Sequence, residues 1–431
     1  MKTTNYILAL ILGLLLFSPN TYSQKKPEKS DKDKKEKTYS DVITDKAVTD
    51  KGLFEVHKIG EKYYYEIHDS LLNRDMLMVT RIAKMAKEIP LGAHKLSEQV
   101  LSWQKFDNNL LLKELSFSNF ASDSLPIKEA VSNANFEPII ASFKIEVENK
   151  DKNTFVVDVT NLFKTDVKSF GYPQSYRKRN KISSLDTKLS FIESIRSFPL
   201  NIESKHIKTY KSSDAKNGQI SMLLNNSMIL LPKKPMKRRY FDERVGWFTT
   251  SQTDYGIDNQ EAESVTYLDR WRLEVKDEDV EKFKNGELVE PKKPIVYYID
   301  RATPKKWRKY LKQGIEDWNA AFEEAGFKNA VICKDPPTEE EDPDWSPEDI
   351  RYSTVRYLAS STLNANGPHV SDPRSGEIIE SDINWYHNVM KLLRNWYFVQ
   401  TSAVDPEARG VEFRNEVMGE LIRFVSSHEF G

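Results

Sequence analysis

The 431-residue sequence predicts an α+β protein with a β-rich N-terminal domain and a second region where strands alternate with long helices. Two observations carry this prediction. Between about residues 39 and 290, short segments of alternating polarity are separated by polar turns. Beyond residue 291, apolar runs alternate with a segment whose apolar residues recur every three to four positions. The length allows two or three domains with sizeable cores.

The first 23 residues have the pattern of a signal peptide. Lys2 precedes an apolar run at residues 6–17, and Thr21-Tyr22-Ser23 places small residues at the −3 and −1 positions of a cleavage site. The apolar run is shorter than the roughly 20 residues that a membrane-spanning helix needs. An uncleaved membrane anchor is the alternative. We expect an exported protein, in the periplasm, at the cell surface or secreted, with no integral membrane association after cleavage.

Residues 24–38 are a charged, low-complexity linker, which we expect to be disordered. The net charge of −1 provides no basic field, so nucleic acid is not an expected partner. Cys333 is the single cysteine, so intramolecular disulfides are excluded. It lies in the apolar run 330–333, and we expect a buried core thiol.

The region 39–290 is predicted to form an antiparallel sandwich or barrel. Polar turns separate the two strands of each of three hairpins, and further strands follow. No nucleophile, base and orienting residue stand at a telling spacing here, and the aromatic residues are expected in the core. The hairpins pair 54–59 with 63–67, 100–103 with 110–112 and 143–147 with 155–159; later strands are expected at 220–224, 227–231 and 265–273.

The region 291–431 begins with a proline-bearing spacer and a continuous apolar strand at 295–299. Thr303 can cap a helix with Pro304 at its first position, and Gly326 can end it, which predicts one helix of about 22 residues. A tight turn is expected at 372–376. Further strands are expected at 330–333, 353–358 and 377–385.

The last segment, from about 407 to 431, reads as a helix. Val417, Leu421, Phe424 and His428 share one face, which Met418, Ile422 and Val425 widen. His428 is therefore expected to point towards the sheet, with Glu429 about 100° around the helix. Zinc peptidases use H-E-x-x-H, because imidazoles four residues apart reach one ion while the glutamate faces the metal-bound water. The dipeptide alone is weak evidence, since roughly half a His-Glu pair is expected by chance. An ordinary helix end with a partly buried histidine is the alternative.

The residues from about 295 to 431 resemble the catalytic domain of a family of large, secreted, matrixin-like zinc-dependent metalloproteases of Gram-negative bacteria, which are metzincins. Two stretches further upstream, 242–248 and 270–273, resemble the β-rich N-terminal region of that family. The matching catalytic stretches are 295–300, 314–319, 321–322, 324–327, 353–357, 367–368, 372–378 and 427–429.

The resemblance implies a Zn²⁺ cofactor, a protein or peptide substrate, His428 as a zinc ligand and Glu429 as the catalytic base. In that family the helix continues as H-E-x-G-H-x-L-G-x-x-H, so two further histidine ligands are expected after residue 431. We therefore expect an N-terminal part of a longer protein, with the upper part of a metzincin-like domain, a mixed sheet with long helices, truncated in the active-site helix. The chain alone is expected to be inactive. Cys333 lies inside the catalytic domain, so no propeptide cysteine latch is implied.

The expected division is a signal peptide (1–23), a linker (24–38), a β-rich domain (39–290) and an incomplete metallopeptidase domain (291–431). A non-catalytic β-rich surface protein that binds glycan or protein is the alternative function. A glycosidase with paired carboxylates is a third, although 65 acidic residues make such pairs uninformative without geometry.

Overall fold

The computed structural model describes residues 37–85 and 95–431. The predicted signal peptide and residues 24–36 of the predicted linker lie outside the described residues. Lys37 forms an ion pair with Glu146, and Thr38 forms a capping box with Asp41 at the start of helix α1 (Tyr39–Val42). The end of the predicted linker therefore has defined contacts.

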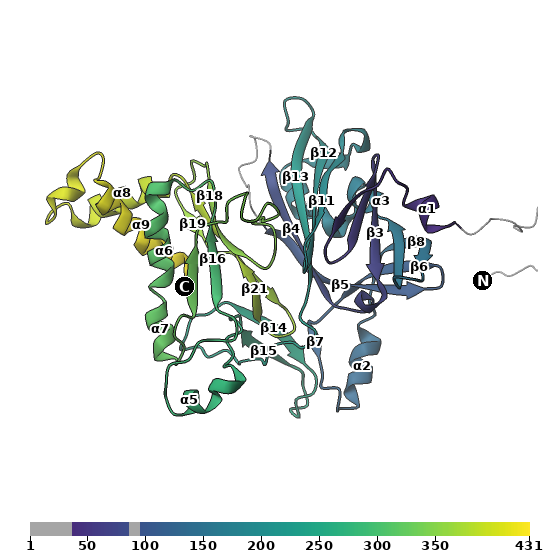
Figure 1. Cartoon of the computed structure of the whole chain (residues 1–431), viewed down its shortest axis with the longest axis horizontal. Helices are drawn as coiled ribbons and strands as arrows, with labels where there is room; N and C mark the ends of the chain where they lie inside the picture. The colour runs from purple at the N-terminus through teal and green to yellow at the C-terminus, as the bar shows by residue number, and fades with distance from the viewer. Residues whose placement is uncertain (1–36, 86–94) are drawn as a thin grey trace, which may run out of the picture.

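The β-rich part is built on one antiparallel sheet of twelve strands, at the right of Figure 1. Its order is β1-β2-β3-β9-β8-β6-β5-β4-β13-β12-β10, with β11 also paired to β12. The strands are β1 (Val48–Lys51), β2 (Glu55–Ile59), β3 (Lys62–His68), β4 (Met76–Met85), β5 (Lys95–Phe106), β6 (Asn109–Leu115), β8 (Ile139–Asn149), β9 (Thr154–Asp158), β10 (Ile182–Leu185), β11 (Phe191–Ser197), β12 (Asn201–Ser212) and β13 (Gln219–Leu230).

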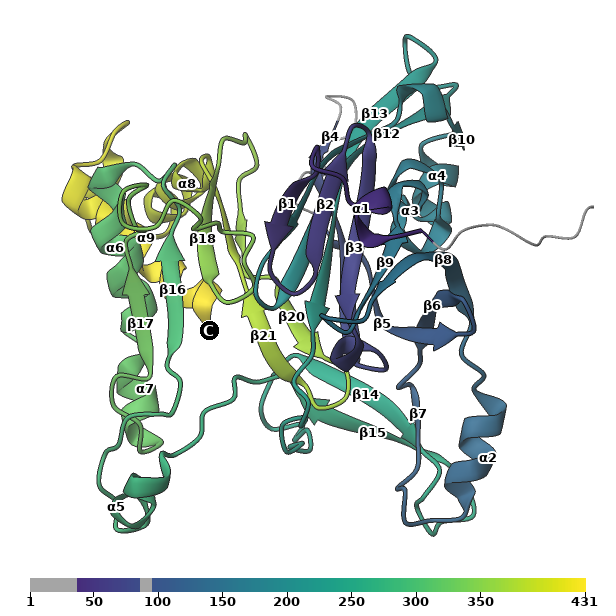
Figure 2. The ribbon, with the colours of Figure 1, turned by 45° about the vertical axis from the view of Figure 1, so that its right-hand side comes forward.

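This sheet curls until it nearly closes, as Figure 2 shows from the side of β1 and β2. Close to β11, the Phe198 carbonyl accepts from the Leu53 amide at 2.7 Å, and the Ser197 amide donates to Asp50 at 2.9 Å. The aromatic side chains of Phe54, Tyr65 and Trp103 fill the interior, with each pair of ring centroids 5.4–6.3 Å apart. Near-closure leaves few unpaired strand edges.

The three predicted hairpins are confirmed. Their turns contain the residues that tolerate a left-handed backbone: Gly60 at φ 61°, Asp107 at φ 49° and Asn153 at φ 53°. The last predicted strand of the region is shorter than expected, as β15 (Glu263–Leu268).

The prediction of two strands at 220–224 and 227–231 is wrong, because β13 runs through both and pairs with β12 and β4 along its length. Asn225 and Asn226, which suggest a turn in the sequence, are 8% and 1% exposed. Their amides donate to Glu203 and Thr80 on the neighbouring strands. Hydrogen bonds to side chains on both neighbouring strands therefore keep these two residues in an extended strand instead of a turn.

A smaller sheet and short helices flank the large sheet. The small sheet has the order β15-β14-β7, and β7 runs parallel to β14. Its other strands are β7 (Asn119–Phe120) and β14 (Thr249–Asp254). The helices are α2 (Ile127–Ala134), α3 (Thr160–Lys164), α4 (Gln174–Arg179) and α5 (Val280–Lys284); 3₁₀ turns lie at Asp69–Leu71, Lys168–Phe170, Thr187–Leu189, Asp277–Asp279 and Pro406–Arg409.

The second part is a mixed five-stranded sheet of order β17-β16-β18-β22-β19, in which only β19 is antiparallel to its neighbour. Its helices lie on the side away from the large sheet (Figure 1). The strands are β16 (Ile295–Ile299), β17 (Val331–Lys334), β18 (Ser353–Leu358), β19 (Ala365–Asn366) and β22 (Ile383–Tyr386), and a hairpin of β20 (His369–Asp372) and β21 (Glu377–Ser381) projects towards the large sheet.

The strands predicted at 295–299 and 353–358 are confirmed with these bounds, and the strand predicted at 330–333 is displaced by one residue. The turn predicted at 372–376 is also confirmed, with Gly376 at φ 71°. The strand predicted at 377–385 divides at Asp382, whose carboxylate accepts from the Thr354 amide at 2.9 Å and from the Arg356 guanidinium at 3.0 Å. The chain changes sheets at this residue.

The single helix predicted between Thr303 and Gly326 is two helices, α6 (Lys305–Glu316) and α7 (Asn319–Glu324). At Trp318 the backbone changes to bonds three residues apart: its amide donates to Ile315 and its carbonyl accepts from Ala321. The Trp318 indole donates to the Ser427 carbonyl at 2.8 Å, so a contact with the last helix holds the break. Pro304, not Thr303, occupies the N-cap position of α6. Gly326, with φ at 93°, ends α7 as predicted.

The C-terminal segment contains two helices, α8 (Val389–Thr401) and α9 (Asn415–Phe430). Helix α8 was not predicted, and α9 begins later than the predicted residue 407. Among the described residues, no helix is both long enough and apolar enough to cross a bilayer.

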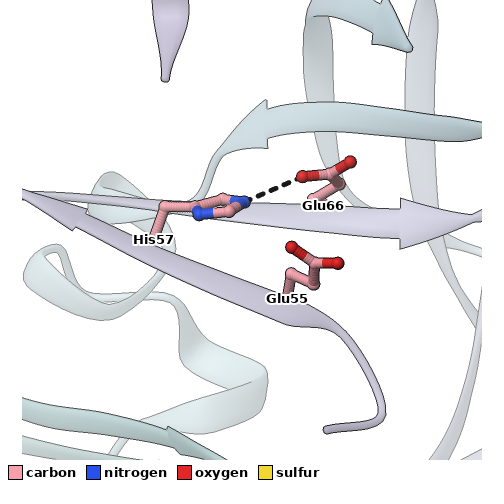
Figure 3. Close-up of side chains that lie close together, drawn as sticks. All are labelled: Glu55, His57 and Glu66. Carbon is pink, nitrogen blue, oxygen red and sulfur yellow. Dashed lines mark hydrogen bonds and ion pairs between the residues drawn. The ribbon is translucent and has the colours of Figure 1, made fainter. Parts of the chain in front are cut away.

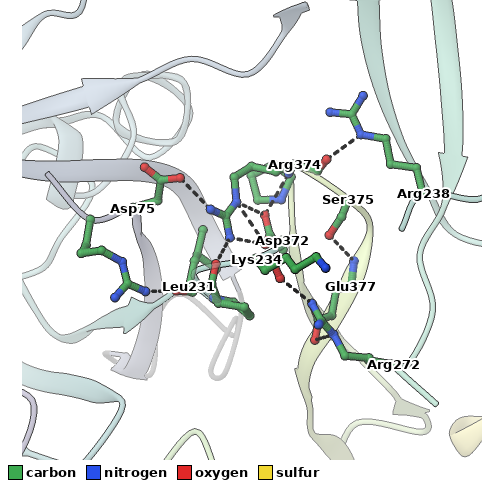
Figure 4. A network of polar contacts seen from close by, with 12 residues as sticks. Asp75, Leu231, Lys234, Arg238, Arg272, Asp372, Arg374, Ser375 and Glu377 are labelled. Carbon is green, nitrogen blue, oxygen red and sulfur yellow. Dashed lines mark hydrogen bonds and ion pairs between the residues drawn. The ribbon is translucent and has the colours of Figure 1, made fainter. Parts of the chain in front are cut away.

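The two parts share a junction with an apolar centre and a polar edge. Leu77, Val79 and Ile229 of the large sheet pack with Ile350 and Val370. At the edge, Arg374 of the β20–β21 turn donates to Asp75, to Asp372 and to the Pro232 carbonyl at 2.7–2.8 Å (Figure 4). Five apolar residues that precede residue 291 belong to the second core or pack against it: Trp271, Leu273, Val275, Phe283 and Val289.

Candidate functional site

Helix α9, which carries His428 and Glu429, is held tightly against α6. Gly314 of α6 lies where a Cβ would overlap the Ser426 hydroxyl and the Arg423 carbonyl, so the helices cross in close contact. The Arg423 guanidinium forms two 2.7 Å hydrogen bonds with Asp317. Because these contacts extend to residue 427, the last turn of α9 has a fixed position.

The prediction that His428 points towards the sheet is wrong. The buried face of α9 consists of Gly419, Ile422, Val425 and Ser426, whereas Phe424 is 68% exposed and His428 is exposed. Ile422 and Val425, which widen the predicted apolar face, are buried, whereas Phe424 and His428 on the same predicted face are not. Gly419 and Ser426 complete the buried face because their small side chains let α6 approach, and a search for apolar residues passes over them.

The two predicted site residues in the last turn of α9, His428 and Glu429, have different environments. The Phe430 ring packs 5.4 Å from that of Tyr297 and 6.0 Å from that of Trp318, which anchors the turn. Glu429 is partly buried, and burial raises the pKa of its carboxyl group while the neighbouring His428 opposes the rise. Within the described part of the chain, the His428 imidazole makes no hydrogen bond, so its nitrogens are available to a ligand.

The segment after β19 lies against the end of α9. A Cβ at Gly367 would overlap the Glu429 carbonyl, so the backbone of this segment closely approaches the last turn. Two residues on, the His369 imidazole hydrogen-bonds Asp269 at 2.9 Å and its ring lies 5.1 Å from the Phe248 ring. The segment from Gly367 to His369 therefore contacts both the last turn of α9 and Phe248.

His428 is the one candidate zinc ligand that the described residues supply in the last turn of α9. A catalytic zinc site uses three protein ligands and a water. Among residues 37–85 and 95–431, no group of three possible His, Cys, Asp or Glu ligands includes His428. The described residues therefore do not form a three-ligand zinc site at α9.

The three-residue group with metal-ligand spacing lies elsewhere, in the β-rich part (Figure 3). Ligand atoms of Glu55, His57 and Glu66, on β2 and β3, all lie within 4.8 Å of one another. The His57 Nε2 is 2.9 Å from a Glu66 oxygen, and Thr49 is 2.8 Å from the Nδ1. Sequence reasoning missed this group because its members are brought together by hairpin register.

This group does not fit a metal ion, because its acceptors already have partners. Glu66 accepts hydrogen bonds from Tyr39 at 2.6 Å and Thr154 at 2.5 Å. The Lys152 ammonium lies 3.2 Å from Glu55 and 3.8 Å from Glu66, where it supplies the positive charge. Burial raises the pKa of Glu66, but hydrogen bonds from His57, Thr154 and Tyr39 outweigh it and lower the pKa to about 2. The group is a satisfied structural network.

Cys333 is 3% exposed, which confirms the predicted core thiol. Burial raises the pKa of this thiol well above its ordinary value.

The sequence also matches two family models. Residues 93–276 match a domain of unknown function, DUF5117, and residues 36–85 match another, DUF5118. Neither description includes an activity, and both matches end before α6. No curated protein and no solved structure matches the chain.

Proposed function

We propose that the protein is an exported, matrixin-like zinc-dependent endopeptidase in which His428 binds zinc and Glu429 is the general base. The observation that carries the proposal is the position of the two residues in the last turn of α9. The turn is fixed by α6 and Phe430, the imidazole is exposed, and the carboxylate is partly buried. The mixed sheet with helices on one side agrees with the architecture that the resemblance implies. Export rests on the pattern of residues 1–23.

Bound zinc would lower the pKa of a coordinated water and polarise the scissile carbonyl. Glu429 would accept a proton from the attacking water and return it to the leaving amine. His428 would hold its imidazole nitrogen towards the ion, on the side of α9 that α6 leaves open. The proposal requires two further ligands, which it assigns to residues after Gly431.

The test uses the complete protein with three substitutions on α9. His428→Ala should lose both zinc and peptide hydrolysis, because it removes a ligand. Glu429→Gln should keep zinc while turnover falls by about 10²–10⁴-fold, the usual contribution of a positioned acid–base group. Glu420→Gln, at an exposed position on α9 more than two turns earlier, is the control and should change neither.

Zinc content by atomic emission and cleavage of a fluorogenic peptide separate these outcomes. If Glu429→Gln hydrolyses the peptide at the wild-type rate, the assignment of this helix is wrong.

A non-catalytic binding surface is the second candidate function. Tyr240, Trp247 and Phe248 are 71%, 51% and 72% exposed in and beside the loop at 242–248. Exposed aromatic side chains at one place suit contact with a protein or glycan. This candidate predicts that the complete protein contains no zinc. It also predicts that Trp247→Ala abolishes the capture of a glycan or a protein.

A further inference from the structure

A polar cavity of about 270 Å³ lies between the two sheets, away from the Glu55–His57–Glu66 network. Strands β4, β12 and β13 line it from one side, and β18, β21 and β22 from the other. It is smaller than the roughly 300–1,000 Å³ typical of pockets for drug-sized ligands, so it suits a small molecule or the end of a chain.

Most charges in the cavity wall are paired. Arg81 lies 3.3 Å from Glu380, Arg356 lies 3.0 Å from Asp382, and Lys205 forms an ion pair with Glu348. Lys84 and Glu193 are exposed at the rim. The wall thus contains three matched pairs.

Glu203 differs from these carboxylates, because no ion pair of its own is present among the described residues. It is 4% exposed and accepts hydrogen bonds from the amides of Asn201 at 2.7 Å and Asn225 at 2.8 Å. The Ser227 hydroxyl is a third partner. Neutral donors solvate this carboxylate but do not balance its charge, and burying an unbalanced charge is unfavourable.

Asn225 adds an unused acceptor beside Glu203. Because its Nδ2 donates to Glu203, the amide orientation is fixed, and the Oδ1 is the end of the amide group that this hydrogen bond leaves unused. This Oδ1 is buried and has no hydrogen-bond partner in the described structure. An unsatisfied buried acceptor is uncommon and indicates a missing donor.

The chemistry of the missing donor follows from the arrangement. Within the described residues, no three carboxylates or imidazoles of this cavity come within 4.8 Å of one another, so a compact cage for a divalent cation is absent here. A primary ammonium group instead offers three N–H donors and one positive charge. We propose that this cavity binds a small primary amine, with Glu203 and the Asn225 Oδ1 accepting hydrogen bonds from its ammonium group.

Proton release should accompany binding. Burial raises the pKa of Glu203 to about 7 and that of Glu380 to about 8. The groups that face them, Arg81, Lys205, Glu348, Arg356 and Asp382, are the paired charges already described. A cation favours the ionised carboxylate, so the affinity for an amine that stays protonated over this range, such as 1,4-diaminobutane, should rise from pH 6 to pH 8.5.

The experiment is calorimetric titration of the full chain with 1,4-diaminobutane, free lysine and a glycine tripeptide, which distinguish a diamine, an amino acid and a peptide N-terminus. At least one should bind saturably at pH 8, at least tenfold more tightly than its trimethylammonium analogue, which has the charge but no N–H donors. Glu203→Gln should weaken binding by at least about tenfold, as expected for loss of a charged hydrogen bond. Glu193→Gln, at the rim, is the matched control and should change affinity less than twofold.

A readout on the wild type keeps the test decisive if Glu203→Gln fails to fold. Titrations in buffers of different ionisation enthalpy should show protons released on binding at pH 7. Three outcomes overturn the proposal: none of the amines binds, the trimethylammonium analogue binds equally well, or calcium binds and displaces the amine.

Discussion

Substitution of Gly314 by alanine should destabilise the second part of the protein, although alanine favours a helix. A Cβ at this position would overlap both the Ser426 hydroxyl and the Arg423 carbonyl. The hydroxyl can rotate, but the carbonyl belongs to the backbone of α9 and cannot. To restore ordinary van der Waals contact, α6 and α9 must separate by on the order of 1 Å.

The magnitude follows from three terms. Overpacking of a close contact costs about 1–3 kcal/mol. The hydrogen bond from Ser426 to the Leu311 carbonyl, 3.2 Å long, contributes about 0.5–1.5 kcal/mol and would be broken. Alanine returns about 1 kcal/mol through helix propensity. The expected net loss is therefore about 2 kcal/mol.

Urea unfolding followed by far-ultraviolet circular dichroism measures this loss. Gly246→Ala is the matched control, because nothing lies within 4 Å of a Cβ there and its backbone is not left-handed. The control should unfold within about 1 kcal/mol of the wild type. A Gly314→Ala protein as stable as the wild type, or more stable, would show that the helices do not cross as closely as described.

Three further perturbations test other parts of the structure. Arg374→Ala leaves the fully buried Asp372 without its partner, so calorimetry should show that the free energy of unfolding falls by about 3–5 kcal/mol. Arg244→Ala, in an exposed ion pair, is the control and should leave the melting temperature unchanged. The folded-state pKa of Glu66 is lowered, so this carboxylate stabilises the folded state by up to about 3 kcal/mol above pH 4.5, and the stabilisation is lost as pH falls towards 2. Acid unfolding of Glu66→Gln should therefore depend less on pH over this window. Cys333 should not react with a chromogenic disulfide until urea unfolds the protein, and a fast reaction in native buffer would contradict its burial.

Local pattern was sufficient wherever neighbouring residues decide the conformation. The hairpin turns were predictable because Gly60, Asp107 and Asn153 tolerate a left-handed backbone and stand between alternating strands. The strand at 295–299 was predictable because its residues are continuously apolar, and Ile295, Tyr297 and Ile299 bury one of its faces. The adjacency of His428 and Glu429 on one helix was likewise readable from the sequence alone.

Two features were predicted wrongly from the sequence pattern because contacts between residues far apart in the chain determine them. Asn225 and Asn226 belong to a continuous strand because Glu203 and Thr80 bond their side chains from the neighbouring strands. The predicted long helix is divided at Trp318, whose indole reaches across to α9. The spacing of apolar residues along one segment gives no information about these distant partners.

The sequence by itself determined that the chain is β-rich at first and mixed afterwards, and that it ends in a helix with His428 and Glu429. Only the tertiary structure decided which face of that helix is buried, because Gly314 sets the approach of α6 and thereby turns His428 outwards. Only the tertiary structure also revealed the cavity at Glu203, since its two walls come from strands more than 100 residues apart in the chain. Periodicity reports which residues share a face, whereas burial depends on which distant element covers that face.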